Sequence, residues 1–301
     1  MSTANPSWDL YRSFLAVLET SSLSGAARSL GLTQPTLARH IGELEEALGF
    51  ELFLRSPRGL SPTDAALELR PHAEALSSAA GALVRAASGV GKTIAGTVRV
   101  TASQVVAAEV LPPIFATLRT EHPALEIELL ATNVVEDLLR RDADIAVRTG
   151  VPEQEALWVK RLGTITLGLH AHRRYLDRQG VPRRMEDLQA HTVIGFDRPT
   201  PYIRGMLARV PGYERVRFAL RVDNDLAQLA AIRAGFGLGI CQAAVARRDP
   251  QLVRVLPTVL DFKMPTWLVM HENLRTTPRC RVVFEGLARG MRGHLDAATG
   301  A

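Results

Sequence analysis

The stretch that decides the fold is residues 22–58, SLSGAARSLGLTQPTLARHIGELEEALGFELFLRSPR. Its spacing predicts two crossed helices joined by a tight turn. Ala27 is a small contact residue, Gly31 is a turn residue with free φ, and Leu37 is an apolar anchor on the second helix. Thr33 is a good N-cap for that helix. We therefore expect a helix-turn-helix.

The second predicted helix has an apolar face and a polar face. Helical spacing predicts that its apolar face is buried and consists of Leu37, Ile41, Leu44 and Leu48. Glutamine pairs with adenine, arginine forks onto guanine, and hydroxyls bind phosphates. Amide, guanidinium and hydroxyl side chains lie on the outward face of the second helix and in the residues before this helix. We therefore expect DNA contacts from Ser24, Thr33, Gln34, Pro35, Thr36, Arg39 and His40. The alternative is a helical hairpin whose polar face is only solvated.

The flanks of this motif extend the prediction. An apolar stripe predicts a preceding helix with Leu10, Phe14, Val17 and Leu18 on one face. Serine is a good N-cap residue, so we expect Ser22 or Ser24 to cap the next helix. Residues 50–54 alternate as a short strand, and residues 55–59 supply a turn. This arrangement is typical of a wing, in which Arg55 and Arg58 point towards the minor groove or the phosphates.

These residues resemble the amino-terminal domain of LysR-type transcriptional regulators. The resemblance is carried by Phe14, Ala26 to Leu30, Leu32-Thr33-Gln34-Pro35, Arg39, Ile41, Leu44-Glu45, Leu48-Gly49, Leu52-Phe53, Arg55, Arg58-Gly59 and Thr63. Ala38 and Leu37 depart from the commonest pattern of the family. The length and order of the rest of the chain also fit.

The resemblance implies three parts. They are an N-terminal α+β winged helix-turn-helix (1–62), a linker and dimerisation helix with a hinge (63–90), and a C-terminal α/β two-lobed periplasmic-binding-protein-like (type II) effector domain (91–301). Lobe I would comprise 91–163 and 268–301, and lobe II 164–267. The implied function is sequence-specific regulation of transcription in bacteria. Homodimers paired into homotetramers would bind double-stranded promoter DNA, respond to a small-molecule effector and contact RNA polymerase.

Residues 63–88 form a predicted long helix capped by Thr63. Leucine and alanine alternate along one seam at four and three spacing, at Leu69, Ala73, Leu76, Ala80, Leu83 and Ala87. We read this seam as an antiparallel dimer interface; the alternative is a helix packed only on its own domain. Gly89, Val90 and Gly91 would then act as a hinge.

From residue 96 onward, predicted strands and helices alternate, which favours a parallel sheet covered by helices. The strands are expected at 98–101, 125–131, 143–148, 164–172, 192–196, 216–222, 238–241, 252–256 and 267–271, and the helices at 106–121, 134–141, 224–234 and 278–293.

Ligands of such folds bind beyond the carboxyl ends of the strands. Nine residues lie at such ends or near the return crossing between lobes: Ser103, Gln104, Thr132, Asn133, Arg148, Thr149, Phe196, Asp223 and Trp267. We expect them to bind a small anion or an aromatic carboxylate, with Arg148 forking onto the carboxylate. Alternatively, Ser103 and Asp223 only cap helices, and Arg148 pairs with Asp142 or Asp144.

Composition narrows the function class. The net charge is +5, but residues 1–63 hold five arginines, no lysine and six acidic residues, so the placement of the arginines carries the DNA prediction. No signal peptide or membrane-spanning run is evident, so we expect a cytoplasmic protein. No catalytic, nucleotide-binding or metal-ligand motif appears, so neither an enzyme nor a cofactor is expected.

Two other function classes remain open. One is a redox sensor that uses Cys241 and Cys280, although free thiols are the simpler expectation for a reducing compartment. The other is an α/β enzyme or solute-binding module fused to a DNA-binding domain.

Overall fold

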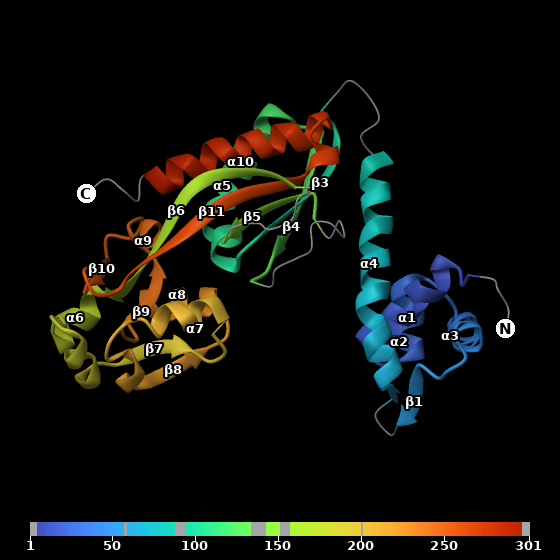
Figure 1. The fold of residues 1–301 in the computed structure, drawn as a ribbon, viewed down its shortest axis with the longest axis horizontal. Helices are drawn as coiled ribbons and strands as arrows, with labels where there is room; N and C mark the ends of the chain where they lie inside the picture. Colours follow the sequence, from blue (N-terminus) through green and yellow to red (C-terminus); the bar gives the residue numbers. More distant parts are fainter. Residues whose placement is uncertain are drawn as a thin grey trace. The chain divides into compact units, whose positions relative to one another are not determined.

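The computed structural model describes residues 5–56, 59–87, 94–133, 143–150, 157–199 and 201–296. The chain forms two compact units, which divide between Val84 and Arg85. This division lies inside helix α4 (Asp64–Ala87), whose last turn therefore groups with the second unit. Figure 1 gives the course of each unit. The three-part division expected at residues 62 and 90 stays a prediction.

The first unit contains the helix-turn-helix. Its elements before α4 are α1 (Trp8–Thr20), α2 (Leu23–Leu30), α3 (Gln34–Leu48), β1 (Phe53–Ser56) and β2 (Gly59–Pro62). The apolar positions anticipated on α1 and α3 form its core, with Leu10, Phe14, Val17, Leu37, Ile41 and Leu44 all buried. Burial of this set is the main force that holds the three helices together.

Side-chain caps begin the helices where the sequence placed them. Ser22 Oγ accepts a hydrogen bond from Gly25 N (3.3 Å), so Ser22 rather than Ser24 caps α2. The hydroxyl of Thr33 accepts from Thr36 N (3.3 Å) and caps α3, and that of Thr63 accepts from Ala66 N (3.2 Å) and caps α4. Such caps contribute about 1 kcal/mol each.

The wing begins later than expected. The strand predicted over residues 50–54 starts only at Phe53. The reason is that the carboxylate of Glu45 on α3 binds the backbone N–H groups at this point of the chain. Its Oε1 accepts from Leu52 N at 2.7 Å and from Phe53 N at 3.3 Å. At the other strand, Leu60 N donates to Ser21 O (2.9 Å). Gly59 has φ +116°, and a Cβ there would lie 2.6 Å from Ser21 O, so only glycine fits at this approach.

A seven-stranded mixed sheet runs through the second unit in the order β10–β6–β11–β5–β3–β4, with β9 also paired to β6. The strands are β3 (Gly96–Ala102), β4 (Leu125–Ala131), β5 (Ile145–Thr149), β6 (Leu157–His172), β9 (Gly239–Gln242), β10 (Leu252–Val255) and β11 (Asp261–His271). The expected parallel pairing is correct for β3 with β4 and β5. It is wrong for β6, β9, β10 and β11, whose pairings are antiparallel.

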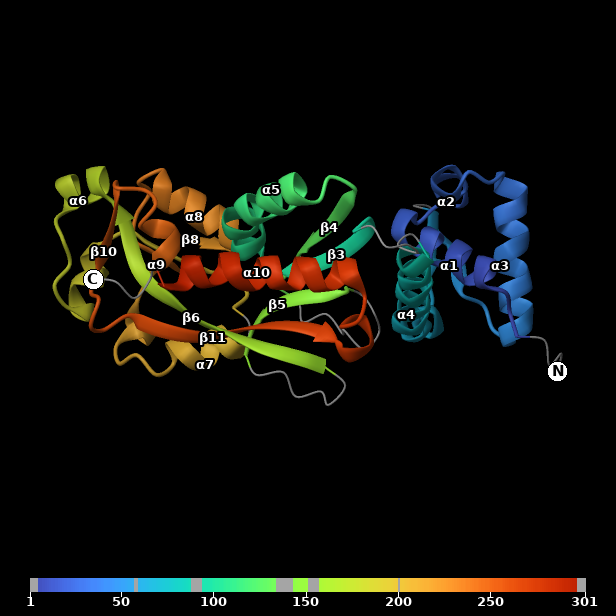
Figure 2. The same ribbon diagram turned by 90° about the horizontal axis from the view of Figure 1, so that it is seen from above.

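The antiparallel pairing of β6 with β11 arises because these two long strands cross between the lobes. β6 carries the chain from lobe I to lobe II and β11 brings it back, so the two run in opposite directions. They lie side by side along their lengths in Figure 1 and Figure 2. The lobe boundaries anticipated near residues 163 and 267 fall inside these strands, where the register shifts between Thr266 and Trp267. The strands expected at 164–172 and 267–271 were therefore too short.

Helices flank both parts of this unit. In lobe I, a π-helical turn (Val106–Val110) leads into α5 (Leu111–Glu121), and α10 (Pro278–Asp296) runs alongside β6 and β11 (Figure 2). In lobe II, β7 (Val193–Phe196) and β8 (Phe218–Val222) pair in parallel beside α8 (Asp225–Arg233). Among the described residues, the sequence did not predict the short helices α6 (Arg173–Gln179), α7 (Pro201–Leu207) and α9 (Ala243–Ala246), nor the 3-10 segments at Met185–Ala190, Tyr213–Arg215 and Glu272–Leu274.

Two expectations fall outside the described residues, namely the helix at 134–141 and the hinge at 89–91. Within the described ranges, none of the helices combines the length and apolar character that a membrane crossing needs.

Candidate functional site

The polar face of α3 is open to solvent. Thr33, Gln34, Pro35 and Arg39 are exposed, while Thr36 and His40 are half-buried. Ser24, on α2, is also half-buried, and its hydroxyl lies 3.0 Å from that of Ser22. The face opposite the core therefore presents one amide, one guanidinium and two hydroxyls, which are the groups that bind base edges and phosphates.

Arg39 is held at this surface by an ion pair. Its Nη1 lies 2.7 Å from Glu43 Oε1, one helical turn further along α3, and the two side chains are 64% and 44% exposed. Surface pairs of this kind contribute about 0–1 kcal/mol. The pair therefore orients the guanidinium, yet costs little to exchange for a guanine or a phosphate.

His40 and Glu45 stabilise the motif from within. His40 Nδ1 lies 2.8 Å from the hydroxyl of Ser13, which is fully buried on α1. This contact uses one ring nitrogen to hold α3 against α1. Glu45, which was not among the candidate residues, connects the end of α3 to the wing through Leu52 N. The sequence did not single out Glu45, because α3 also carries acidic residues that are only solvated, and nothing in the local pattern distinguishes Glu45 from them.

Arg55 belongs to β1, but its side chain and the whole of Arg58 lie outside the described residues. Their contact with DNA stays a prediction.

The stripe of leucine and alanine residues along α4, predicted as a dimer interface, differs in burial between its first and second halves. Ala73 is buried and Leu69 half-buried against the core of the first unit, so the first half packs on its own domain. Further along α4, Ala80 is half-buried and Ala87 exposed, whereas Leu76 and Leu83 remain 43% and 67% exposed. The alternative of intramolecular packing thus accounts for Leu69 and Ala73 only.

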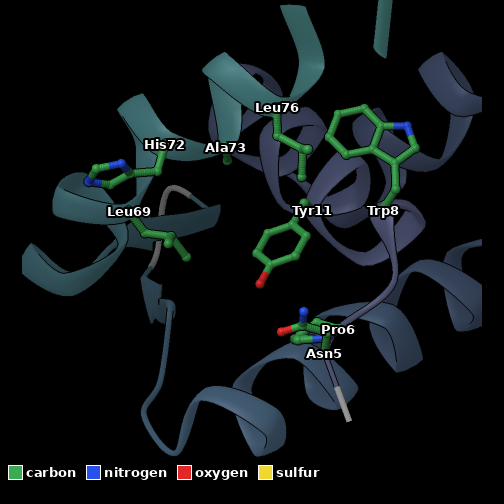
Figure 3. A pocket seen from close by; sticks show the side chains of 8 residues that line it. All are labelled: Asn5, Pro6, Trp8, Tyr11, Leu69, His72, Ala73 and Leu76. Carbon is green, nitrogen blue, oxygen red and sulfur yellow. The ribbon is translucent and has the colours of Figure 1, made fainter. Parts of the chain in front are cut away.

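A pocket of about 460 Å³ lies beside the first half of this stripe. Figure 3 shows the side chains that surround it, from the segment before α1, from α1 and from α4: Asn5, Pro6, Trp8, Tyr11, Leu69, His72, Ala73 and Leu76. Leu76 lines this pocket, and Leu83, which is more exposed and follows two helical turns later on α4, continues the apolar stripe beyond it.

In the second unit, hydrogen bonds join the two lobes at the carboxyl ends of β3 and β4. Asn133 Oδ1 accepts from Gln104 N (3.2 Å), and Asn133 Nδ2 donates to Asp225 Oδ2 (2.7 Å). Asp225 N in turn donates to Gln104 Oε1 (3.3 Å), which closes a ring of three residues. Two of the predicted effector residues, Gln104 and Asn133, are thereby brought together with one that was missed.

Asp225 was missed because it directly follows two other polar residues, Asp223 and Asn224, at the beginning of α8. Asn224 is the cap, since its Oδ1 accepts from Leu226 N and Ala227 N. Asp223, the predicted site residue, is exposed, and it neither caps α8 nor joins the ring. Burial raises the pKa of Asp225, and the hydrogen bond from Asn133 opposes this shift.

Arg148 lies on a sheet face of lobe I. Its Nη2 donates to Thr101 Oγ1 (3.2 Å) on β3, and Trp267 is its direct cross-strand neighbour on β11. The Nε1 of Trp267 is buried, without a hydrogen-bond partner among the residues described. Asp144 pairs with Arg85 (3.1 Å), and no ion pair between Asp144 and Arg148 is found among the described residues. Asp142 lies outside the described residues.

Four other predicted residues lie on the same two lobes: Ser103, Thr132 and Thr149 adjoin residues already described, and Phe196 ends β7 in lobe II. Ser103 and Thr132, both half-buried, directly precede Gln104 and Asn133, and Ser103 O accepts from Ala107 N (2.8 Å) as the helix begins. Thr149 is exposed at the end of β5. Phe196 is partly buried and packs against the core.

A second connection between the lobes lies at the other end of α8. Arg233 donates to both carboxylate oxygens of Glu109 (2.7 and 2.9 Å), and this ion pair lowers the pKa of Glu109. Arg248 donates to Glu109 O and lies 2.9 Å from His294 Nδ1 on α10. Both ends of α8 are therefore hydrogen-bonded to lobe I.

Both cysteines are buried free thiols. Burial raises the pKa of Cys241 and of Cys280 to about 12. Because the thiolate is the reactive form, neither thiol is activated for oxidation at neutral pH. Cys241 Sγ contacts His170 Nδ1 (3.4 Å) on β6, whereas Cys280 begins α10 beside Arg279.

Comparison with known proteins adds independent evidence. The model "Bacterial regulatory helix-turn-helix protein, lysR family" matches residues 8–67, and "LysR substrate binding domain" matches residues 91–292. The HTH-type transcriptional regulator YhjC of Escherichia coli (strain K12) is 28% identical over 294 residues, which cover 94% of this chain and 97% of that protein.

Solved structures share the fold. CbnR, a LysR family transcriptional regulator, superimposes with a TM-score of 0.67 at 20% identity, over 95% of this chain and 99% of CbnR. CbnR complexed with its target DNA gives 0.65 at 22% identity, over 94% and 99%. The substrate-binding-domain match alone spans more than half of the chain, so this protein belongs to the LysR family of bacterial helix-turn-helix regulators.

Proposed function

We propose that this protein binds promoter DNA sequence-specifically through α3 and changes transcription when a small molecule binds where the two lobes meet. The observation that carries the first part is the division of α3 into a buried apolar face and an exposed polar face that bears Gln34 and Arg39. Support also comes from CbnR, a regulator of the same fold that has been solved on its target DNA.

The effector site is proposed at the carboxyl ends of β3, β4 and β5. Parallel strands of one sheet bring these ends together, and α8 of lobe II meets them there through Asp225. We propose contacts from Ser103, Asn133, Arg148 and Phe196, with the guanidinium of Arg148 binding a carboxylate of the ligand. Small anions and aromatic carboxylates fit this set.

Assembly and location complete the proposal. The stripe of α4 would pair two protomers, and dimers would pair into tetramers that hold two half-sites of a dyad-symmetric operator. Such a regulator acts in the cytoplasm, where it meets DNA and RNA polymerase. The function needs no catalytic step.

Two measurements test the proposal. DNase footprinting of the full-length protein on the DNA adjoining its own gene should protect two half-sites about one helical turn or a multiple of it apart. In a reporter strain, Arg148→Ala should abolish the response to the effector and leave the footprint in place. Absence of any protected site would overturn the DNA-binding function. Loss of both footprint and response, or a retained response, would remove the effector-site assignment.

A further inference from the structure

The ring of Gln104, Asn133 and Asp225 has a defined pattern of donors and acceptors. Two of its donors are main-chain N–H groups at the beginnings of helical segments, Gln104 N in lobe I and Asp225 N in lobe II. Each is occupied by the oxygen of a neutral side-chain amide, at 3.2 and 3.3 Å. These are long hydrogen bonds for N–H···O contacts, whose usual distance is about 2.9–3.0 Å.

A carboxylate suits these two positions better than an amide oxygen does. Hydrogen bonds to an ionised acceptor are roughly twice as strong as those between neutral groups. The first turn of a helix also carries a partial positive charge, and that of α8 begins at Asp225. A ligand carboxylate would therefore displace the side-chain amides of Asn133 and Gln104 from the N–H groups that they occupy.

The third group of the ring, the carboxylate of Asp225, favours a cation rather than an anion. Among the described residues, the Asp225 carboxylate accepts one side-chain hydrogen bond, the short one of 2.7 Å from the neutral Nδ2 of Asn133. Among the residues that the structure describes, no lysine, arginine or histidine lies within ion-pair distance of it. Asp225 is half-buried, and a carboxylate shielded from water in this way is stabilised by a cation at this distance, whereas a simple anion placed beside it is repelled.

We propose that the effector is a small amphoteric molecule, an amino-acid-like compound whose carboxylate and ammonium groups stand on neighbouring atoms. Its carboxylate takes the N–H groups of Gln104 and Asp225, and its ammonium takes the Asp225 carboxylate in place of Asn133 Nδ2. This inference rests on the proposed function, because it names the ligand class of the same inter-lobe site. Asp225 is then the residue that distinguishes amino acids from plain carboxylic acids.

The test compares matched ligands on the full-length protein by thermal shift and calorimetry. The probes are the standard L-amino acids, each beside its 2-hydroxy acid, which lacks the ammonium, and its amino-acid amide, which lacks the carboxylate. At roughly millimolar concentration at least one amino acid should raise the melting temperature. Its hydroxy acid and its amide should bind at least about tenfold more weakly.

Two isosteric variants refine the test. Asp225→Asn should weaken binding of the amino acid at least about tenfold, because the ammonium contact is lost. The hydroxy acid should bind the variant more tightly than it binds wild type, because the charge that repels its carboxylate is gone. Asp223→Asn is the matched control: it removes an exposed carboxylate two residues away and should bind the amino acid as wild type does. Circular dichroism establishes that both variants are folded.

The outcomes separate the inference from the function on which it rests. Equal binding of amino acid and hydroxy acid, no response to any amino acid, or full affinity in Asp225→Asn would each overturn the amphoteric ligand. If plain carboxylates bind instead and Arg148→Ala removes that binding, the proposed effector site stands and only the ligand class is wrong. If the footprint is absent, the proposed DNA-binding function itself fails.

Discussion

The guanidinium of Arg85 lies 3.1 Å from the carboxylate of Asp144, and both side chains are less than a tenth exposed. The pair is embedded in main-chain contacts. Asp144 Oδ2 also accepts from Arg99 N (2.8 Å), and Arg279 Nη2 donates to Arg85 O (2.7 Å). The last turn of α4 is thus bonded into the second unit, to which Arg85 belongs.

Asp144→Asn should lower the free energy of unfolding of the second unit by about 3–5 kcal/mol, the usual cost of breaking a buried ion pair, because it takes the Asp144 carboxylate away from the buried guanidinium of Arg85. Urea unfolding followed through the fluorescence of Trp158 and Trp267 measures this loss. Glu285→Gln is the control, since it breaks the exposed pair with Arg281 and should cost at most about 1 kcal/mol. Equal effects of the two variants would contradict the importance of burial.

Arg39→Ala should reduce operator affinity by about 1–3 kcal/mol and relax selectivity at one base pair, as expected for a lost arginine–guanine fork. Competition binding against an operator library measures both quantities. The matched variant Glu43→Gln leaves the arginine in place and removes only its ion-pair partner, so it should keep the same base preference. If Arg39→Ala weakens all sequences equally, the contact is to phosphate instead.

Arg55→Ala should weaken binding to every DNA sequence and reduce the slope of log affinity against log salt by about one unit. The reason is that a wing arginine on the phosphate backbone releases about one counterion. Fluorescence anisotropy over a series of salt concentrations gives the slope. An unchanged slope would remove Arg55 from the DNA interface.

Leu83→Glu should dissociate the dimer and with it high-affinity operator binding, because the 67%-exposed side chain lies on the stripe of α4 that we expect to meet a second protomer. Leu67→Glu is its control. Leu67 is also exposed, but helical spacing puts it on the opposite face of α4. Light scattering reports the assembly state; an intact dimer in Leu83→Glu would show that the stripe is not the interface.

Acid should destabilise the second unit as the pH falls from about 6.5 to about 4. Burial lowers the pKa of His170 to about 4 from its ordinary value of 6.5, so between these values the unfolded chain binds a proton that the folded chain does not. Stability is therefore present in full above the unfolded pKa and lost as the pH falls to the folded one. The loss from His170 is on the order of 3 kcal/mol at most.

His170→Gln removes the titrating group, and unfolding measured across this pH range should then change less steeply. His172→Gln serves as the comparison, since His172 is half-buried and caps α6 through Arg174 N. A pH dependence that is identical in wild type and His170→Gln would rule out this histidine as the source.

The amino-acid sequence by itself determined the local features of this protein. The caps at Ser22, Thr33 and Thr63 and the buried faces of α1 and α3 followed from residues a few positions apart. Interactions over three or four residues depend on helix geometry, which is the same in every protein. The family resemblance rested on this same local stretch. The order of the strands in the second unit was likewise readable from periodicity, whereas the short helices α6, α7 and α9 were not.

The tertiary structure decided which side chains meet. Asn133 and Asp225 are 92 positions apart in the chain, and Arg85 and Asp144 are 59 apart. Nothing in local spacing distinguishes Asp225 from Asp223, or assigns Asp144 to Arg85 rather than to Arg148. The first choice follows from the packing of α8 against lobe I, and the second from the contact between the last turn of α4 and the residue that precedes β5. The inter-lobe ring exists only once these long-range contacts have formed, because each of its three hydrogen bonds joins residues from different elements of the folded domain.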